Sequence, residues 1–225
     1  MAVSLFTEIR LLLGKEWKSE FRRRDHFAAL VIYLLSTLFI CYLSFEKIAD
    51  GQTWGALLWV TGLFTSFNAM HKALDSAQQP QLLHLYTLAR PSAVIVSRCI
   101  YHALQIAVLN VCSLLLFLLF FGDTVLAKMD WGQLITGLLL GSTGLGITLT
   151  FVASLAQKTG NGVGLMAILG FPLVIPLLIT IVKFTRLAIE GVTWASNGYQ
   201  LMLLAVLNVL AIVLAYLLFP YLWRE

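Results

Sequence analysis

The chain has 225 residues, of which 60% are hydrophobic and 12% are charged, and its formal net charge is +4. A soluble domain carries about 25% charged residues, so a globule of this composition could not cover its surface in water. The composition therefore excludes soluble, disordered and disulfide-stapled proteins and predicts a membrane-embedded chain.

The first 25 residues are polar enough to lie outside the lipid core. Their apolar residues recur every three or four positions and predict one stripe along a helix: Val3, Phe6, Ile9, Leu13, Trp17 and Phe21. We expect residues 1–25 to form an amphipathic helix lying in the membrane interface. A secretory signal is not expected, because the basic cluster at 22–24 comes late and no small-residue cleavage site follows.

Six apolar stretches follow, and each is long enough to cross a bilayer as a helix. Their approximate bounds are 27–45, 53–70, 98–121, 132–156, 162–182 and 200–222. The runs are continuous and lack the alternation of membrane strands, which favours helices. We therefore predict an all-α fold with a six-span transmembrane domain over residues 26–225. The outer segment 183–199 carries charges at helical spacing and predicts another short interfacial helix.

The distribution of basic residues predicts the orientation. With the N-terminus in the cytoplasm, 11 of the 15 lysines and arginines lie on the cytoplasmic side. The other 4 lie on the outer side: Lys47, Lys128, Lys183 and Arg186. Since cytoplasmic loops are enriched in Lys and Arg, both termini are expected inside.

The long cytoplasmic segment 71–97 contains a short amphipathic stretch. Pro80 suits a helix start, and Arg90-Pro91 suits a stop. The predicted helix at about 78–90 is far too short to span a membrane. Its candidate docking residues for an ATPase are Leu82, Leu83, Leu85, Tyr86, Leu88 and Arg90.

Glycines and prolines mark two of the spans. Gly137 and Gly141 form a GxxxG motif, which predicts close packing inside the bundle or, alternatively, a sliding or dimer contact. Pro172 and Pro176 are one turn apart and predict a kinked or broken span. Such a span is either a static kink or a place where a transporter bundle moves or lines a cavity.

No catalytic motif is present, and the chain is not expected to be an enzyme. The single Gly-Lys pair, Gly14-Lys15, lacks the upstream glycine of a P-loop, so ATP is expected only in a separate subunit. Residues 28–45 and 132–156 contain no Asp, Glu, Lys or Arg, which argues against an ion-driven carrier. His102 is a candidate heme or metal ligand; the alternative is a hydrogen-bonded histidine within the bundle.

Together these features are typical of a transport subunit that a separate ATPase drives. The short loop helix would dock into a groove of that ATPase. Two other classes stay open, namely a carrier or channel that works alone and a membrane scaffold without transport. The first would transport without nucleotide when purified, and the second would recruit partners without nucleotide-dependent movement.

Two segments resemble the heme exporter protein B (CcmB) family. The more specific one is the run from 162 to 179 around Phe171-Pro-Leu-Val-Ile-Pro-Leu-Leu178, and the other is the loop from 81 to 98. The family's loop usually carries several acidic residues, whereas Asp75 is the only acid here. Docking is therefore expected through the leucines.

This resemblance implies an ABC-2-like exporter subunit in the bacterial inner membrane. Its implied partners are a cytoplasmic ABC ATPase, a heme-handling membrane subunit and the lipid bilayer, and no nucleic acid is expected. It also implies a role in cytochrome c maturation, where ATP hydrolysis in the partner is tied to heme handling or to release of a heme-loaded chaperone. No cofactor is expected in this chain, although the complex could hold heme.

Overall fold

The computed structural model describes residues 5–21, 24–45, 50–76, 89–121, 129–158 and 162–224. All regular structure in these ranges is helical, which confirms the all-α prediction. The helices are α1 (Leu5–Phe21), α2 (Arg24–Ser44), α3 (Gly51–Ser76), α5 (Pro91–Phe121), α6 (Trp131–Lys158), α7 (Gly162–Ile189) and α8 (Trp194–Arg224).

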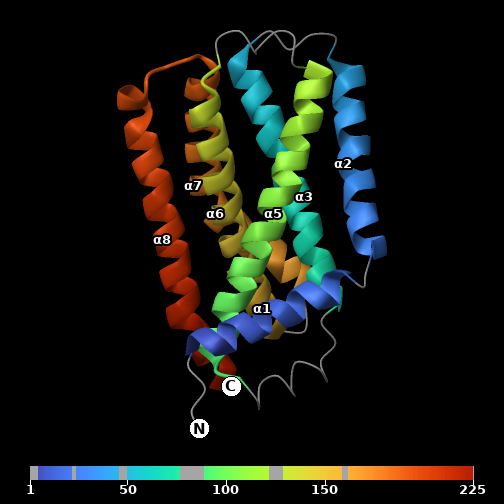
Figure 1. The fold of residues 1–225 in the computed structure, drawn as a ribbon, viewed down its shortest axis with the longest axis vertical. Helices are drawn as coiled ribbons and strands as arrows, with labels where there is room; N and C mark the ends of the chain where they lie inside the picture. Colours follow the sequence, from blue (N-terminus) through green and yellow to red (C-terminus); the bar gives the residue numbers. More distant parts are fainter. Residues whose placement is uncertain are drawn as a thin grey trace.

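The long helices α2 to α8 run alternately up and down, and both chain termini lie at the same end of the bundle (Figure 1). Helix α1 lies across that end, roughly perpendicular to the long helices (Figure 1). Four of the described helices, α5 to α8, are long and apolar enough to cross a membrane. The apolar part of α2, Ala28–Ser44, is shorter. These features are those of a polytopic membrane protein.

The helices extend beyond the apolar stretches that predict them. Helix α5 begins at Pro91 rather than near 98, and α8 begins at Trp194 rather than near 200. The expected interfacial helix at 183–199 is wrong, because α7 continues to Ile189 and only a short turn separates it from α8. Gly191 makes this turn with a φ of 71°, a conformation that favours glycine.

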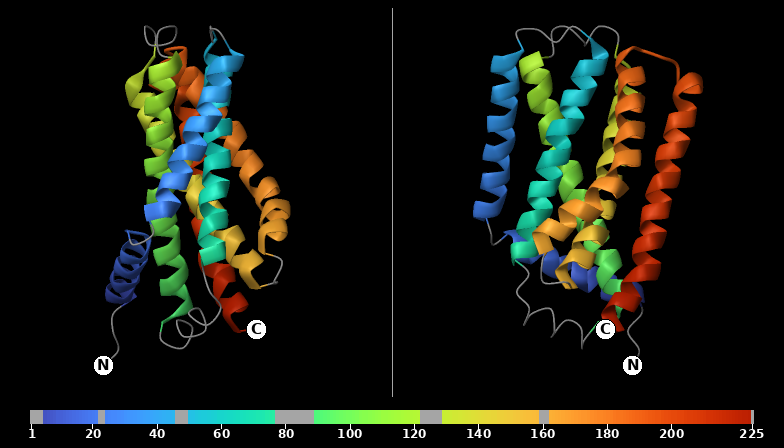
Figure 2. Two further views of the ribbon diagram at one scale, coloured as in Figure 1. Left: turned by 90° about the vertical axis from the view of Figure 1, so that its right-hand side faces the viewer. Right: turned by 180° about the vertical axis from the view of Figure 1, so that it is seen from behind.

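Helix α6 forms the centre of the bundle and contacts α3, α5, α7 and α8. Of its most apolar stretch, 78% is buried inside the chain, compared with 17% for α8. Helix α8 therefore lies at the edge of the bundle, and so does α2, which contacts α3 and α5 (Figure 2).

The edge helices α2 and α8 expose many large apolar side chains. Large exposed side chains include Ile32 and Ile40 on α2 and Met202 and Val209 on α8. A water-soluble monomer rarely shows apolar patches of this extent, whereas a bilayer solvates them well. The outer faces of α2 and α8 are thus suited to lipid.

Helix α1 carries apolar side chains both toward the bundle and on its exposed surface. Phe6 and Trp17 are exposed on one flank, while Ile9 and Leu13 are half-buried. Leu12, which is not in the predicted stripe, packs on a cluster that includes Val94 and Ile95 of α5. One side of α1 therefore contacts the bundle, and the helix also carries exposed apolar side chains.

Candidate functional site

The first candidate site is the end of the predicted docking segment. Residues 77–88, with Leu82, Leu83, Leu85, Tyr86 and Leu88, lie outside the described residues. Arg90 is described and stands directly before α5. Its carbonyl accepts hydrogen bonds from the N–H groups of Ala93 and Val94, at 3.0 and 3.1 Å. Pro91 is the first residue of α5, a position where its missing N–H costs nothing.

Arg90 also joins α5 to α1. Its N–H donates a hydrogen bond to Oε1 of Glu8 at 2.8 Å, and its Nε lies 3.8 Å from Oε2 of the same carboxylate. Glu8 is mostly covered, with 17% of its side chain exposed. Arg90, at the end of the predicted docking segment, is therefore tied to α1.

His102 lies on α5, one turn above Arg98. Its Nδ1 lies 3.1 Å from Oε1 of Gln105, and the ring of Tyr101 packs edge-on at 5.1 Å. The described part of the chain holds no group of three or more His, Cys, Asp or Glu residues that could bind a metal. The contact with Gln105 engages Nδ1, and a ligating histidine usually has one ring nitrogen held in this way. The role of His102 as a heme or metal ligand therefore stays a prediction.

Gly137 and Gly141 face the inside of the bundle. A Cβ atom on Gly137 would lie 2.5 Å from the ring of Phe184 on α7. A Cβ atom on Gly141 would lie 2.5 Å from the ring of Trp59 on α3 and 2.9 Å from Ile181. Both glycines therefore let large side chains of α3 and α7 approach the backbone of α6.

Pro172 and Pro176 both lie within α7, which is helical on either side of them. Figure 2 shows α7 curved along its length. Neither proline can donate an intrahelical hydrogen bond, so this stretch of α7 is held less firmly than a regular helix. Directly before them, Phe171 stacks on Phe67 of α3, with ring centroids 5.4 Å apart.

A polar seam crosses the middle of the bundle. No pattern in the sequence had predicted it. Asn110 of α5 donates from Nδ2 to Oγ of Ser142 on α6 at 3.1 Å, and Ser142 donates to the carbonyl of Leu138 at 2.6 Å. Asn208 of α8 donates to the carbonyl of Leu140 at 3.2 Å. Asparagines inside apolar runs are a signal that could have pointed to this seam.

A second network joins α6, α7 and α8 at the end of the bundle opposite the termini. Gln133 donates from Nε2 to the carbonyl of Val192 at 2.6 Å and to Oδ2 of Asp130 at 3.0 Å. Asn197 donates from Nδ2 to Oε1 of Gln133 at 2.7 Å and to the carbonyl of Phe184 at 3.2 Å. We call these four residues, Asp130, Gln133, Val192 and Asn197, the outer clamp.

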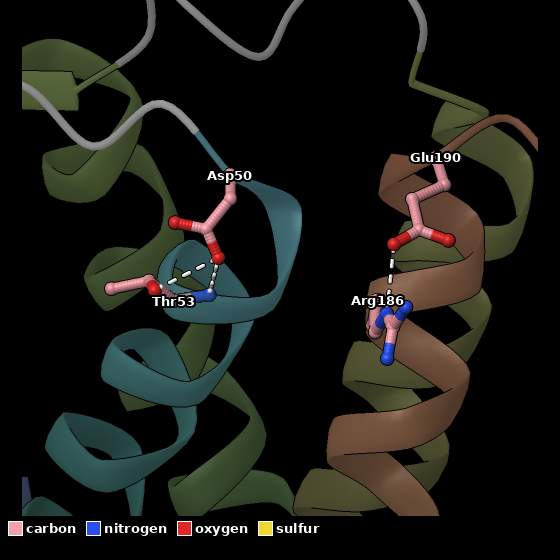
Figure 3. Close-up of polar contacts among 4 residues, drawn as sticks. All are labelled: Asp50, Thr53, Arg186 and Glu190. Carbon is pink, nitrogen blue, oxygen red and sulfur yellow. Dashed lines mark hydrogen bonds and ion pairs between the residues drawn. The ribbon is translucent and has the colours of Figure 1, made fainter.

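Charged side chains cap the helices at this same end. Asp50 accepts hydrogen bonds at 2.9 Å from the N–H and the hydroxyl of Thr53, and so caps α3 (Figure 3). Nearby, Arg186 pairs with Glu190 at 2.7 Å (Figure 3). The hydrogen bonds from Thr53 lower the pKa of Asp50 below its ordinary value, and the charge of Arg186 adds a smaller effect.

The carboxylate of Asp130 accepts hydrogen bonds at the start of α6, and its contribution to stability is expected to depend on pH. The N–H and side chain of Gln133 donate to its carboxylate and lower its pKa below the ordinary 3.8. A carboxyl with a lowered pKa in the folded state contributes stability above its ordinary pKa and loses it as pH falls through the folded value. We therefore expect the contribution of Asp130 to be constant from pH 7 to 5 and to fall below about pH 4.

The variant Asp130→Asn tests this expectation. It should unfold at a lower temperature than the parent at pH 7, and the difference should shrink as pH is lowered from 5 to 3. The measurement is thermal unfolding in detergent across that pH range. A difference that stays constant down to pH 3 would contradict the assigned role of the carboxylate.

Comparison with known proteins matches the chain to one family. A family model described as CcmB protein matches residues 7–222, which is nearly the entire chain. No curated protein matches the chain.

Proposed function

The chain belongs to the CcmB protein family and is a membrane component of a heme exporter complex; from this premise, we propose that it couples ATP hydrolysis in a partner subunit to heme handling in cytochrome c maturation. The reaction would be release of a heme-loaded chaperone or another heme-handling step. ATP would bind the partner, a cytoplasmic ABC ATPase. A heme-handling membrane subunit would complete the assembly, and any heme would belong to the complex.

The proposed topology has six spans, α2, α3, α5, α6, α7 and α8, in an ABC-2-like fold. An even number of spans places both termini on one side, as the positions of the two ends in Figure 1 support. The 11 to 4 distribution of Lys and Arg favours the cytoplasm for that side. We place the chain in the bacterial inner membrane, with α1 in the cytoplasmic interface.

The proposed coupling acts through the ends of the docking segment. This segment joins the end of α3 at Ser76 to the start of α5 at Pro91. Both helices contact α6 directly. Closure of an ATPase dimer against the segment would therefore displace α3 and α5 relative to α6 and α7. The observation that carries this proposal is the anchoring of Arg90 between Glu8 and the first turn of α5.

Replacing Leu82 and Leu85 with aspartate tests the docking step. Two charges among the leucines of the predicted docking helix would oppose burial in a groove of the ATPase. We expect co-purification of the ATPase to fall by about tenfold or more, which corresponds to about 1.4 kcal/mol or more of lost binding. The measurement is the amount of ATPase recovered with the tagged chain in mild detergent.

The matched control is Leu11→Asp, an exposed leucine of α1 at the same end of the bundle. It introduces one aspartate at that end of the bundle without altering the docking segment and should leave recovery unchanged. Unchanged recovery with the Leu82 and Leu85 variant would contradict docking through these leucines.

A further inference from the structure

The two halves of α7, residues 162–171 and 177–189, make different kinds of contact with the rest of the bundle. In its second half, the hydroxyl of Thr185 accepts a hydrogen bond from Nε1 of Trp59 at 2.8 Å. The carbonyl of Phe184 accepts from Asn197, and the carbonyl of Ala188 accepts from the N–H of Asp130 at 3.0 Å. These bonds attach residues 177–189 to α3, α6 and α8 at the outer end.

The first half is held by apolar packing. Phe67 of α3 stacks on Phe171 with 24° between the ring planes, and a Cβ on Gly170 would lie 3.3 Å from the Phe67 ring. Met166 is buried, and Val152 of α6 lies within contact distance of Gly170. Such packing is non-directional, so it can re-form after a shift more readily than a hydrogen bond.

The two halves meet at Pro172 and Pro176. Because neither residue has a backbone N–H, the carbonyls of Ile168 and Pro172 lack their usual helical donors. The backbone between the halves can therefore bend at lower cost than elsewhere in the helix. Helix bending at such a point is a common element of conformational change.

Helix α3 connects the proline-containing part of α7 to the docking segment. Its last residue, Ser76, directly precedes the segment, and Phe67 lies nine residues earlier, about 13 Å along the helix. Trp59 lies a further eight residues away, about 12 Å, and holds α3 to the fixed half of α7. A push on the end of α3 therefore moves Phe67 about a pivot near Trp59.

We propose that α7 works as two parts, with residues 162–171 turning about Pro172 and Pro176 when α3 displaces Phe67, while residues 177–189 stay fixed. The bundle then opens between α3 and α7 at its cytoplasmic end and stays closed at its outer end. This inference rests on the proposed function, because the displacement of α3 comes from the ATPase.

Cysteine cross-linking in the assembled complex tests the proposal. Cys41, Cys99 and Cys112 are first replaced with alanine. One pair, Val152→Cys with Gly170→Cys, reports on the moving half and keeps Phe67 and Phe171, since a Cβ on Gly170 would lie 3.7 Å from Cγ1 of Val152 on α6. A second pair, Gly55→Cys with Ile189→Cys, reports on the fixed half and keeps the bond from Trp59 to Thr185, since a Cβ on Gly55 would lie 3.6 Å from Cδ1 of Ile189. A short bifunctional thiol reagent is applied without nucleotide and with the ATPase trapped by ATP and vanadate.

We expect trapping to slow cross-linking of the 152/170 pair by about fivefold and to leave the rate of the 55/189 pair within about twofold. Adding Pro172→Ala and Pro176→Ala should remove the nucleotide dependence of the first pair, since both backbone hydrogen bonds are restored. Pro220→Ala in α8 is the matched control and should leave that dependence intact.

Equal cross-linking rates at 152/170 with and without trapped nucleotide, in a complex that retains the ATPase, would overturn this inference and leave the proposed function standing. An equally large change at 55/189 would also overturn it, because the outer half would not be fixed. Failure of the ATPase to co-purify would overturn both the proposed function and the inference.

Discussion

The free energy of unfolding of a Gly146→Ala variant is expected to be about 3 kcal/mol lower than that of the parent. The added Cβ would lie 2.5 Å from Cα and 2.8 Å from N of Ala103 on α5. These are backbone atoms, so no side-chain rotation can relieve the overlap, and α5 and α6 would have to separate. Separation would loosen the cluster that includes Val94, Ala103 and Ile147.

Thermal unfolding in detergent measures this loss. For a domain of this size, about 3 kcal/mol corresponds to a fall in Tm of about 6–12 °C. The matched control is Gly198→Ala on α8, where an added Cβ meets no atom within 4 Å. Alanine is the better helix former there, so this variant should unfold at the same or a higher temperature. Equal Tm values for Gly146→Ala and the parent would contradict the assigned contact.

Replacing Gln133 with leucine is expected to have a similarly large effect through a different mechanism. Leucine has nearly the volume of glutamine but cannot hydrogen-bond. The carbonyl of half-buried Val192 and the amide of buried Asn197 would each lose a partner. Each unpaired buried group costs about 1–3 kcal/mol, so we expect a loss of about 3 kcal/mol in total.

The control is Gln52→Leu, which makes the same change at an exposed position near the start of α3. It should shift the Tm by little, since surface substitutions usually stay within about 0.5 kcal/mol. Thermal unfolding of both variants compares them directly. If Gln133→Leu were as stable as Gln52→Leu, the outer clamp would not hold α6, α7 and α8 together.

The helical fold follows from the sequence because continuous apolar runs have few alternatives in a membrane. The ends of the helices cannot be predicted from the same runs. Hydropathy falls where a helix leaves the lipid, whereas the backbone hydrogen bonds of the helix continue. This is why α5 extends back to Pro91 and α7 extends forward to Ile189. The predicted helix at 183–199 failed for the same reason: Lys183 and Arg186 belong to the last turns of α7.

The candidate sites were predictable to different degrees. Spacing alone singled out Gly137 and Gly141, but among the described glycines the closest approach to a neighbouring backbone is at Gly146, outside that motif. The outer clamp joins Gln133 to Asn197, which are 64 residues apart, and no local pattern marks such a pair. The contact between Glu8 and Arg90 spans 82 residues and was missed for the same reason.

The most direct test of the proposed coupling is a pull-down of the tagged chain from its native membrane in mild detergent. Mass spectrometry would identify the recovered proteins, and a visible spectrum would detect heme in the eluate. The proposal predicts a stoichiometric soluble ABC ATPase together with another membrane subunit. Recovery of the chain alone at every detergent strength would contradict it and would favour a carrier that works alone.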